Sequence, residues 1–112
     1  MSNYTLTYNT LSQNMERYSN LVAPVVYQMM NRLIINVCSV YNNVISNNND
    51  QWIDFLQAIN RGFLILINPN YTVFHGFSYI IDFYHNYITN RNCPANIRNI
   101  INEMRIYIHI DI

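Results

Sequence analysis

Residues 24–46 read PVVYQMMNRLIINVCSVYNNVIS and carry the clearest helical signal in the chain. At about 100° per residue, the apolar side chains of this stretch fall into one arc and the polar ones lie opposite. The apolar arc consists of Val26, Met30, Leu33, Val37, Val40, Tyr41 and Val44. Pro24 suits the first position of a helix, because its missing N–H would be unpaired there anyway. The pattern predicts an amphipathic helix over about 25–46 that is central to the core.

Helical spacing of apolar residues continues on both sides of this stretch. Before it, Leu11, Met15, Tyr18 and Val22 predict a helix over about 11–22, with Thr10 and Gln13 as a capping box. After it, a third helix begins near Asp50. Its apolar face consists of Trp52, Phe55, Leu56, Ile59, Phe63 and Leu66, and its polar face of Asp50, Asp54, Gln57 and Arg61. A fourth helix is expected over about 73–90, capped by Asn70 or Thr72, and a fifth from Pro94 to about Met104.

Both ends of the chain alternate between apolar and polar residues, which is typical of strands. Residues 3–8 and 105–112 are therefore predicted to be short amphipathic strands. Residues 63–67 fit either the end of the third helix or a strand paired with residues 71–75, and the helix is preferred. The expected fold is a mainly α, compact bundle of about five helices with terminal strands. The alternative is an α+β fold with a small sheet that includes residues 63–67 and 71–75.

The composition describes one globular domain, residues 1–112. The chain has 112 residues, 51% of them hydrophobic and 11% charged, which excludes a disordered polypeptide. Its formal net charge is zero, which argues against a large electrostatic surface for nucleic acid. Two cysteines, Cys38 and Cys93, are too few for a disulfide scaffold, and we expect them to be unbridged. No secretory signal and no membrane-spanning stretch is predicted, so we expect a cytoplasmic protein.

The surface is expected to be unusual, because the chain is rich in asparagine and contains no lysine. Lysine accepts ubiquitin and acetyl groups, and it is also strongly hydrated. A lysine-free chain escapes modification on its side chains and has a surface that associates readily. Both properties favour a virus- or parasite-encoded protein, and chance in a short chain is the plain alternative.

Four residues are candidates for chemistry: His75, Asp82, His85 and Cys93. Two imidazoles and a carboxylate on the polar face of the fourth helix resemble half of a metal site, with Asp82 and His85 as the closest pair. Over ten residues, however, a helix rises about 15 Å, which places His75 too far from His85 to share an ion. Cys93 precedes Pro94, and a thiol at a helix N-terminus can be reactive through a lowered pKa. No metal or cofactor is expected, and a metal- or thiol-dependent enzyme is kept as an alternative.

Two further functional classes, nucleotide-binding enzymes and nucleic-acid-binding proteins, have little support in the sequence. Only Gly62 and Gly76 are glycines, so neither a phosphate-binding loop nor a dinucleotide fingerprint is possible. Arg91, Arg98 and Arg105 recur every seven residues and, with the many tyrosines, keep a single-stranded nucleic-acid binder as a second alternative.

The preferred hypothesis is a non-enzymatic protein that binds a host protein or its own copies. Tyrosine and asparagine make adaptable contacts of the kind found in binding surfaces. A half-buried isoleucine-rich edge also invites pairing with another chain. We therefore expect a homodimer with the C-terminal segment at its interface. The interface candidates are Ile106, Tyr107, Ile108 and Ile110.

The segment with Trp52, Asn60-Arg61-Gly62 and the apolar run after it resembles the central helix of small viral survival-factor folds. The resemblance covers fewer than twenty residues and implies no site residue.

Overall fold

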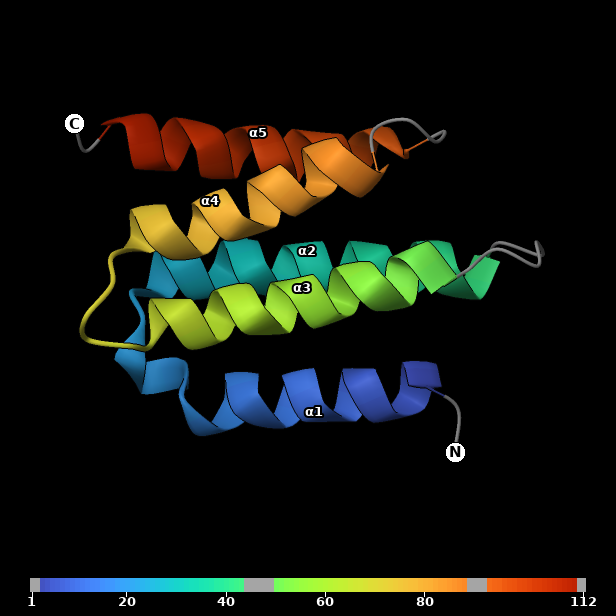
Figure 1. Cartoon of the computed structure of the whole chain (residues 1–112), viewed down its shortest axis with the longest axis horizontal. Helices are drawn as coiled ribbons and strands as arrows, with labels where there is room; N and C mark the ends of the chain where they lie inside the picture. Colours follow the sequence, from blue (N-terminus) through green and yellow to red (C-terminus); the bar gives the residue numbers. More distant parts are fainter. Residues whose placement is uncertain (1–2, 44–49, 89–92, 111–112) are drawn as a thin grey trace.

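The computed structural model describes residues 3–43, 50–88 and 93–110, which are almost entirely helical (Figure 1). The elements in chain order are α1 (Asn3–Arg17), the 3₁₀-helix η1 (Ser19–Leu21), α2 (Pro24–Asn43), α3 (Asp50–Leu66), α4 (Val73–Phe83), the π-helix η2 (Tyr84–Ile88) and α5 (Ala95–Ile110). The predicted mainly α bundle of five helices is confirmed.

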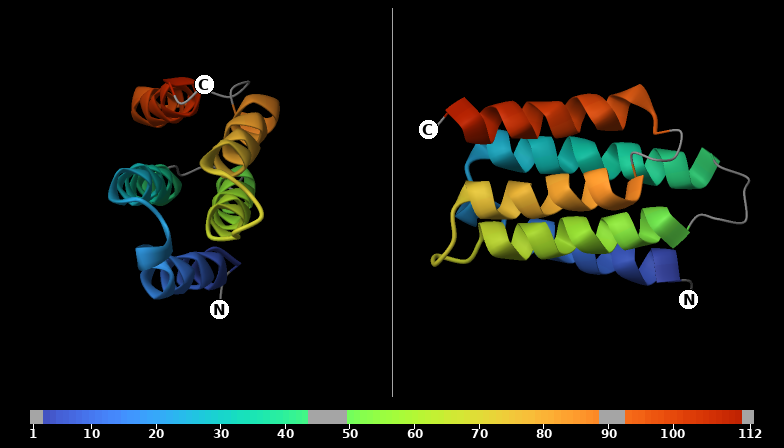
Figure 2. Two further views of the ribbon diagram at one scale, coloured as in Figure 1. Left: turned by 90° about the vertical axis from the view of Figure 1, so that its left-hand side faces the viewer. Right: turned by 45° about the horizontal axis from the view of Figure 1, so that its top comes forward.

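Four of the helices form a ring around one core. Helix α2 packs on α3, α3 on α4, α4 on α5, and α5 returns to α2. The end-on view in Figure 2 shows α5 and α2 in one layer and α4 and α3 in the other. Helix α1 lies along one edge of this ring, where it packs on α3.

The core is apolar throughout. Among the described residues no charged or strongly polar side chain is buried, so the helices are held together by hydrophobic packing. Helix α2 contributes the face that the sequence predicts, with Val26, Met30, Leu33 and Val37 each fully buried. The last three predicted residues of this helix, 44–46, lie outside the described residues.

The predicted N-terminal strand is wrong, because residues 3–8 begin helix α1. Leu6 and Tyr8, read as one face of a strand, are exposed. The buried side chains of α1 are Leu11 and Met15, one helical turn apart, and Tyr4 stacks on Tyr41 of α2 with ring centroids 3.9 Å apart. The predicted capping box is also wrong. Thr10 lies inside the helix, and its hydroxyl donates to the carbonyl oxygen of Leu6 (3.0 Å).

The predicted C-terminal strand is wrong for the same reason, because residues 105–110 continue helix α5. Ile97, Ile100, Ile101, Met104 and Ile108 are buried at helical spacing, so one face of a single helix meets the core. Residues 111 and 112 lie outside the described residues.

The hairpin alternative for residues 63–75 is also wrong. Phe63 and Leu66 are buried in the last turns of α3, and α4 begins at Val73 after a short connection. Of the two proposed caps, Thr72 holds the cap position. Its backbone N–H donates to Nδ1 of His75 (3.2 Å), which ties the first turn of α4 to the residue before it.

Helices α3 and α4 approach closely where the two glycines of the chain face each other. A Cβ on Gly76 would lie 2.9 Å from the carbonyl oxygen of Gly62 and 2.6 Å from Cγ of Leu66. A Cβ on Gly62 would lie 2.5 Å from a side-chain carbon of Ile80. No other residue type fits either position without a shift of its neighbours. We call this contact the glycine seam.

Candidate functional site

The three candidate metal ligands are not brought together. His75 lies in the first turn of α4, where its ring accepts the cap hydrogen bond from Thr72. Asp82 is exposed seven residues later, about 10 Å further along the helix axis. His85 lies in η2, and its Nε2 contacts the guanidinium of Arg105 on α5. Within residues 3–43, 50–88 and 93–110, no three His, Cys, Asp or Glu side chains are grouped so that they could hold a metal ion.

The Cys93 thiol lies next to the start of α5, as the sequence suggests, but its environment is opposite to that of a reactive thiol. It contacts the carbonyl oxygen of Pro94 at 3.6 Å. Partial burial raises the pKa of Cys93, and this effect outweighs the nearby Tyr84 hydroxyl and Arg98, which lower it. Burial also raises the pKa of Cys38. Neither thiol is therefore activated as a thiolate nucleophile near neutral pH.

The arginine stripe of the nucleic-acid alternative is only partly described. Arg98 is exposed on α5, Arg105 is half-buried beside His85, and Arg91 lies outside the described residues.

A groove between α3 and α4 has a volume of about 600 Å³. We call it the α3–α4 groove. Its lining residues are Asp50, Gln51, Asp54, Gln57, Ala58 and Arg61 from α3, with Tyr79, Phe83 and Tyr87 from α4 and η2. In Figure 1 the ribbons of the two helices lie close together near the α3–α4 connection and diverge toward η2. The residues that line the groove belong to this diverging part of the pair.

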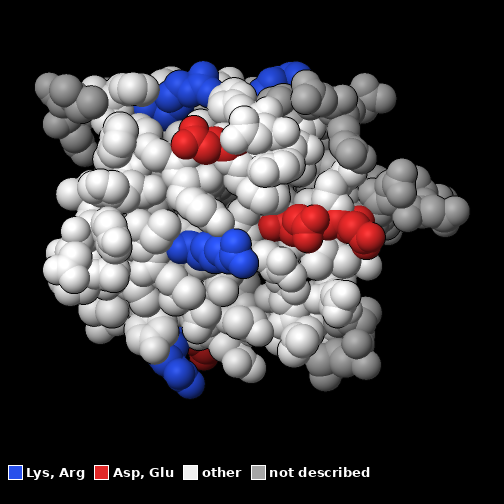
Figure 3. Space-filling model, in the orientation of Figure 1, with Lys and Arg blue, Asp and Glu red and all other residues white. Residues whose placement is uncertain are grey.

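One wall of the groove is acidic. Asp50 and Asp54 are one turn apart on α3, and both are exposed. Within the described part of the chain, neither carboxylate forms an ion pair. Figure 3 shows acidic side chains gathered beside one basic side chain near the middle of this face, with other charged side chains toward its upper and lower edges.

The opposite wall is aromatic. Tyr79, Phe83 and Tyr87 follow one another at every fourth residue, and the rings of Phe83 and Tyr87 are 4.7 Å apart. The ring of Phe83 also stacks on Phe55 of the core at 5.9 Å. Phe83 is therefore held between the core and the 60% exposed Tyr87. The groove is thus lined by aromatic rings on one side and by two carboxylates on the other, a combination suited to a cation.

The basic residue at the groove, Arg61, is already engaged. Its Nη1 donates to the hydroxyl of Tyr79 (3.4 Å), which links α3 to α4 across the groove. Sequence reasoning assigned Asp54 and Arg61 to a solvated helix face and did not find the groove. The available signal was the matching spacing of acidic residues on α3 and aromatic residues on α4.

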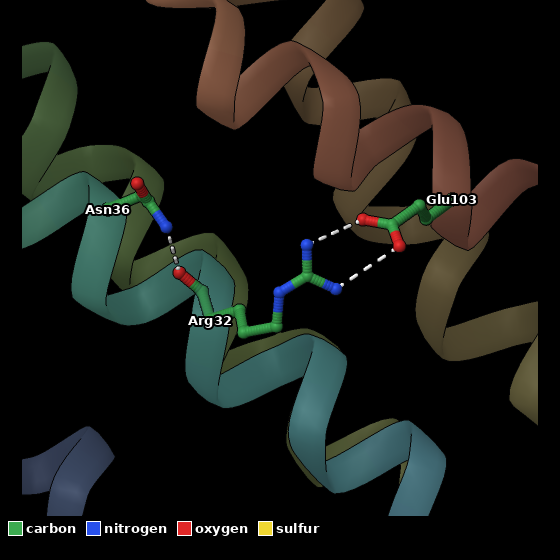
Figure 4. A network of polar contacts seen from close by, with 3 residues as sticks. All are labelled: Arg32, Asn36 and Glu103. Carbon is green, nitrogen blue, oxygen red and sulfur yellow. Dashed lines mark hydrogen bonds and ion pairs between the residues drawn. The ribbon is translucent and has the colours of Figure 1, made fainter.

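A second, smaller hollow of about 320 Å³ lies between α2 and α5. We call its surroundings the α2–α5 face; its lining residues are Val25, Gln28, Met29, Arg32, Glu103, Ile106 and Tyr107. Arg32 and Glu103 form a two-pronged ion pair across it, with N···O distances of 3.2 and 2.9 Å (Figure 4). Both side chains are about half exposed, so the ion pair orients the two side chains but adds little to the free energy of unfolding.

The α2–α5 face contains two of the four interface candidates. Ile106 is 57% exposed, and Tyr107 is half-buried beside it. Ile108 faces the core and is 6% exposed, so it is not available to a partner. Ile110 ends α5, and its side chain lies outside the described part of the structure. The exposed apolar surface of the C-terminal segment is thus one side of a helix and not the edge of a strand.

Comparison with known proteins yields no relative: no protein-family model, curated protein or solved structure matches this chain. Across the described helices, none is both long enough and apolar enough to cross a bilayer.

Proposed function

We propose that this chain is a non-enzymatic interaction protein that self-associates through the α2–α5 face. The observation that carries the proposal is the position of Ile106 and Val25, which are 57% and 46% exposed beside the same hollow. Two large apolar side chains on one small area gain free energy when a second surface removes them from water.

The composition of this face supports a protein contact. Tyrosine and arginine are enriched at protein interfaces, and lysine is depleted. The α2–α5 face contains Tyr107 and Arg32, and the chain contains no lysine at all. A symmetric dimer would place the same patch of each copy against the other, with Ile106 of one copy over the hollow of its partner.

The separation of His75, Asp82 and His85, and the raised pKa of Cys93, favour this reading over a metal- or thiol-dependent enzyme. The lysine-free composition supports a viral or parasite origin, in which case a host protein is a further partner.

The test compares two equally exposed isoleucines on different surfaces. Light scattering at high micromolar concentration should show a dimer for the parent chain and a monomer for Ile106→Glu, because the new carboxylates would face each other across the contact. Ile35→Glu is the matched control. Ile35 is 59% exposed and lines a separate hollow between α1 and α2, so this variant should remain dimeric.

A monomeric parent chain would refute self-association. A dimer that survives Ile106→Glu but is lost in Ile35→Glu would indicate that the interface lies on the opposite side of α2, near α1. A point substitution is preferable to removal of residues 106–112, because that deletion would also remove the buried Ile108.

A further inference from the structure

We propose that the α3–α4 groove binds an arginine side chain from a basic segment of a protein partner, with the guanidinium between the two aspartates and the aromatic wall. This inference concerns a different surface from the α2–α5 face and does not depend on self-association.

The first argument is charge. Two like charges one turn apart on a helix repel each other, and the chain supplies neither with an ion pair among the described residues. Asp50 is at the first position of α3, where the helix dipole favours a negative charge. Asp54 lies in the second turn, beyond the reach of that effect. The helix dipole therefore does not stabilise the negative charge of Asp54. A bound cation would compensate this charge.

The second argument is the aromatic wall. The ring of Tyr87 is 60% exposed and packs on Phe83, which is in turn fixed against Phe55, so Tyr87 offers an exposed ring face that is supported by the core and loses little freedom when a ligand stacks on it. Cations bind over such faces, and a planar guanidinium both stacks on rings and pairs with carboxylates. Ala58 is 2% exposed and small, which leaves room for the methylene stem of the ligand at the base of the groove.

The third argument is that Arg61, the arginine of the groove itself, does not occupy the proposed guanidinium position between the aspartates and the aromatic wall. Arg61 donates to the Tyr79 hydroxyl and forms no ion pair with Asp54. The groove volume of about 600 Å³ is in the range of sites that enclose a ligand, and it exceeds what one side chain needs. The neighbouring residues of a partner segment would occupy the remainder.

A metal ion fits this groove less well. Calcium takes six to eight oxygen ligands and magnesium needs near-ideal octahedral geometry, whereas the groove offers two exposed carboxylates beside rings. The acidic and aromatic walls together select an organic cation.

The experiment measures fluorescence anisotropy of a labelled, short Ala/Gly peptide with one central arginine, titrated with the full chain. Matched peptides carry citrulline, which has the same shape without the charge, or lysine. We expect the arginine peptide to bind about tenfold more tightly than the citrulline peptide, and more tightly than the lysine peptide. Binding should weaken as salt is added, because exposed charges are screened.

The variant Asp54→Asn should weaken arginine-peptide binding about fivefold to tenfold. Asp82→Asn is the matched control, since Asp82 is an exposed aspartate of α4 that does not line the groove, and it should bind like the parent chain. Circular dichroism should show that both variants keep the parent helicity.

Three results would overturn the proposal: no measurable binding of the arginine peptide, equal binding of the citrulline peptide, or equal losses in Asp54→Asn and Asp82→Asn. Lysine-peptide binding as tight as that of arginine would overturn the assignment of a guanidinium. The self-association variant Ile106→Glu should bind the arginine peptide unchanged, which separates this inference from the proposed dimer.

Discussion

At one end of the α3–α4 pair the backbones meet through Gly62 and Gly76, and at the other end the same two helices stand apart around a groove of about 600 Å³. The closed end has no space for a Cβ, and its side chains Phe63 and Phe77 are fully buried. The open end is lined by two exposed carboxylates, the exposed Tyr87 and the half-buried Tyr79 and Phe83. One helix pair thus concentrates its packing at one end and presents a binding surface at the other, because the seam fixes the point from which the helices diverge.

The largest contrast between the two ends should appear when an aromatic ring is removed from each. Phe63→Ala at the closed end should lower the free energy of unfolding by about 3–5 kcal/mol, because it removes a fully buried ring and leaves a cavity. Tyr87→Ala at the open end should cost no more than about 1.5 kcal/mol, the scale of one aromatic pair. Urea unfolding of both variants measures the difference, and equal losses would show that the open end is also part of the core.

A smaller effect is expected when a single methyl group is added to the seam. In most helices Gly→Ala stabilises by about 1 kcal/mol. Gly76→Ala should instead destabilise by about 1–2 kcal/mol, because the added Cβ would lie under 3 Å from a backbone oxygen and from Leu66. The reverse change at the open end, Ala58→Gly, should cost about 1–2 kcal/mol, because it lowers helix propensity and removes a buried methyl group. A stabilised Gly76→Ala variant would mean that the seam is loose.

The bundle itself could be predicted from the sequence, because buried apolar residues at helical spacing leave a strong local pattern. The buried face of α2 and the helical end of α3 were both predicted correctly. The two termini were not. Tyr4, Leu6 and Tyr8 alternate as a strand does, yet Tyr4, Tyr8, Leu11, Met15 and Tyr18 also repeat at steps of four and three. Over six residues the two periods are hard to distinguish, and the helical one wins because α1 packs as a long element on α3.

The binding surfaces could be predicted less well, since they depend on which helix faces meet. Asp50, Asp54 and Arg61 look like an ordinary solvated face until Tyr79, Phe83 and Tyr87 are placed opposite them. Ile106 was predicted to be an interface residue on a strand edge, whereas the structure places it exposed on helix α5. His75 was singled out for its metal-binding imidazole, whereas its ring holds the start of α4. In each case the residue type was visible in the sequence and its neighbours were not.

The smallest effect concerns the phenol of Tyr84. Tyr84, the first residue of η2, is 2% exposed. Burial is the main reason that its pKa rises to about 12, with the Cys93 thiol as a second cause. In the unfolded chain the tyrosine pKa is about 10. The folded state therefore keeps the proton that the unfolded state loses, and stability from this group is complete below pH 10 and is lost as the pH rises toward 12.

Tyr84→Phe removes this group and should flatten the alkaline side of the stability profile. Between pH 9 and 11, we expect the parent chain to lose about 1 kcal/mol more than the variant, which follows from about 1.4 kcal/mol per unit of pKa difference. Urea unfolding at a series of pH values measures this, and the interval from pH 7 to 9 is the internal control, in which the two profiles should run parallel. Parallel profiles up to pH 11 would contradict the raised pKa and show that the Tyr84 hydroxyl reaches water in the folded chain.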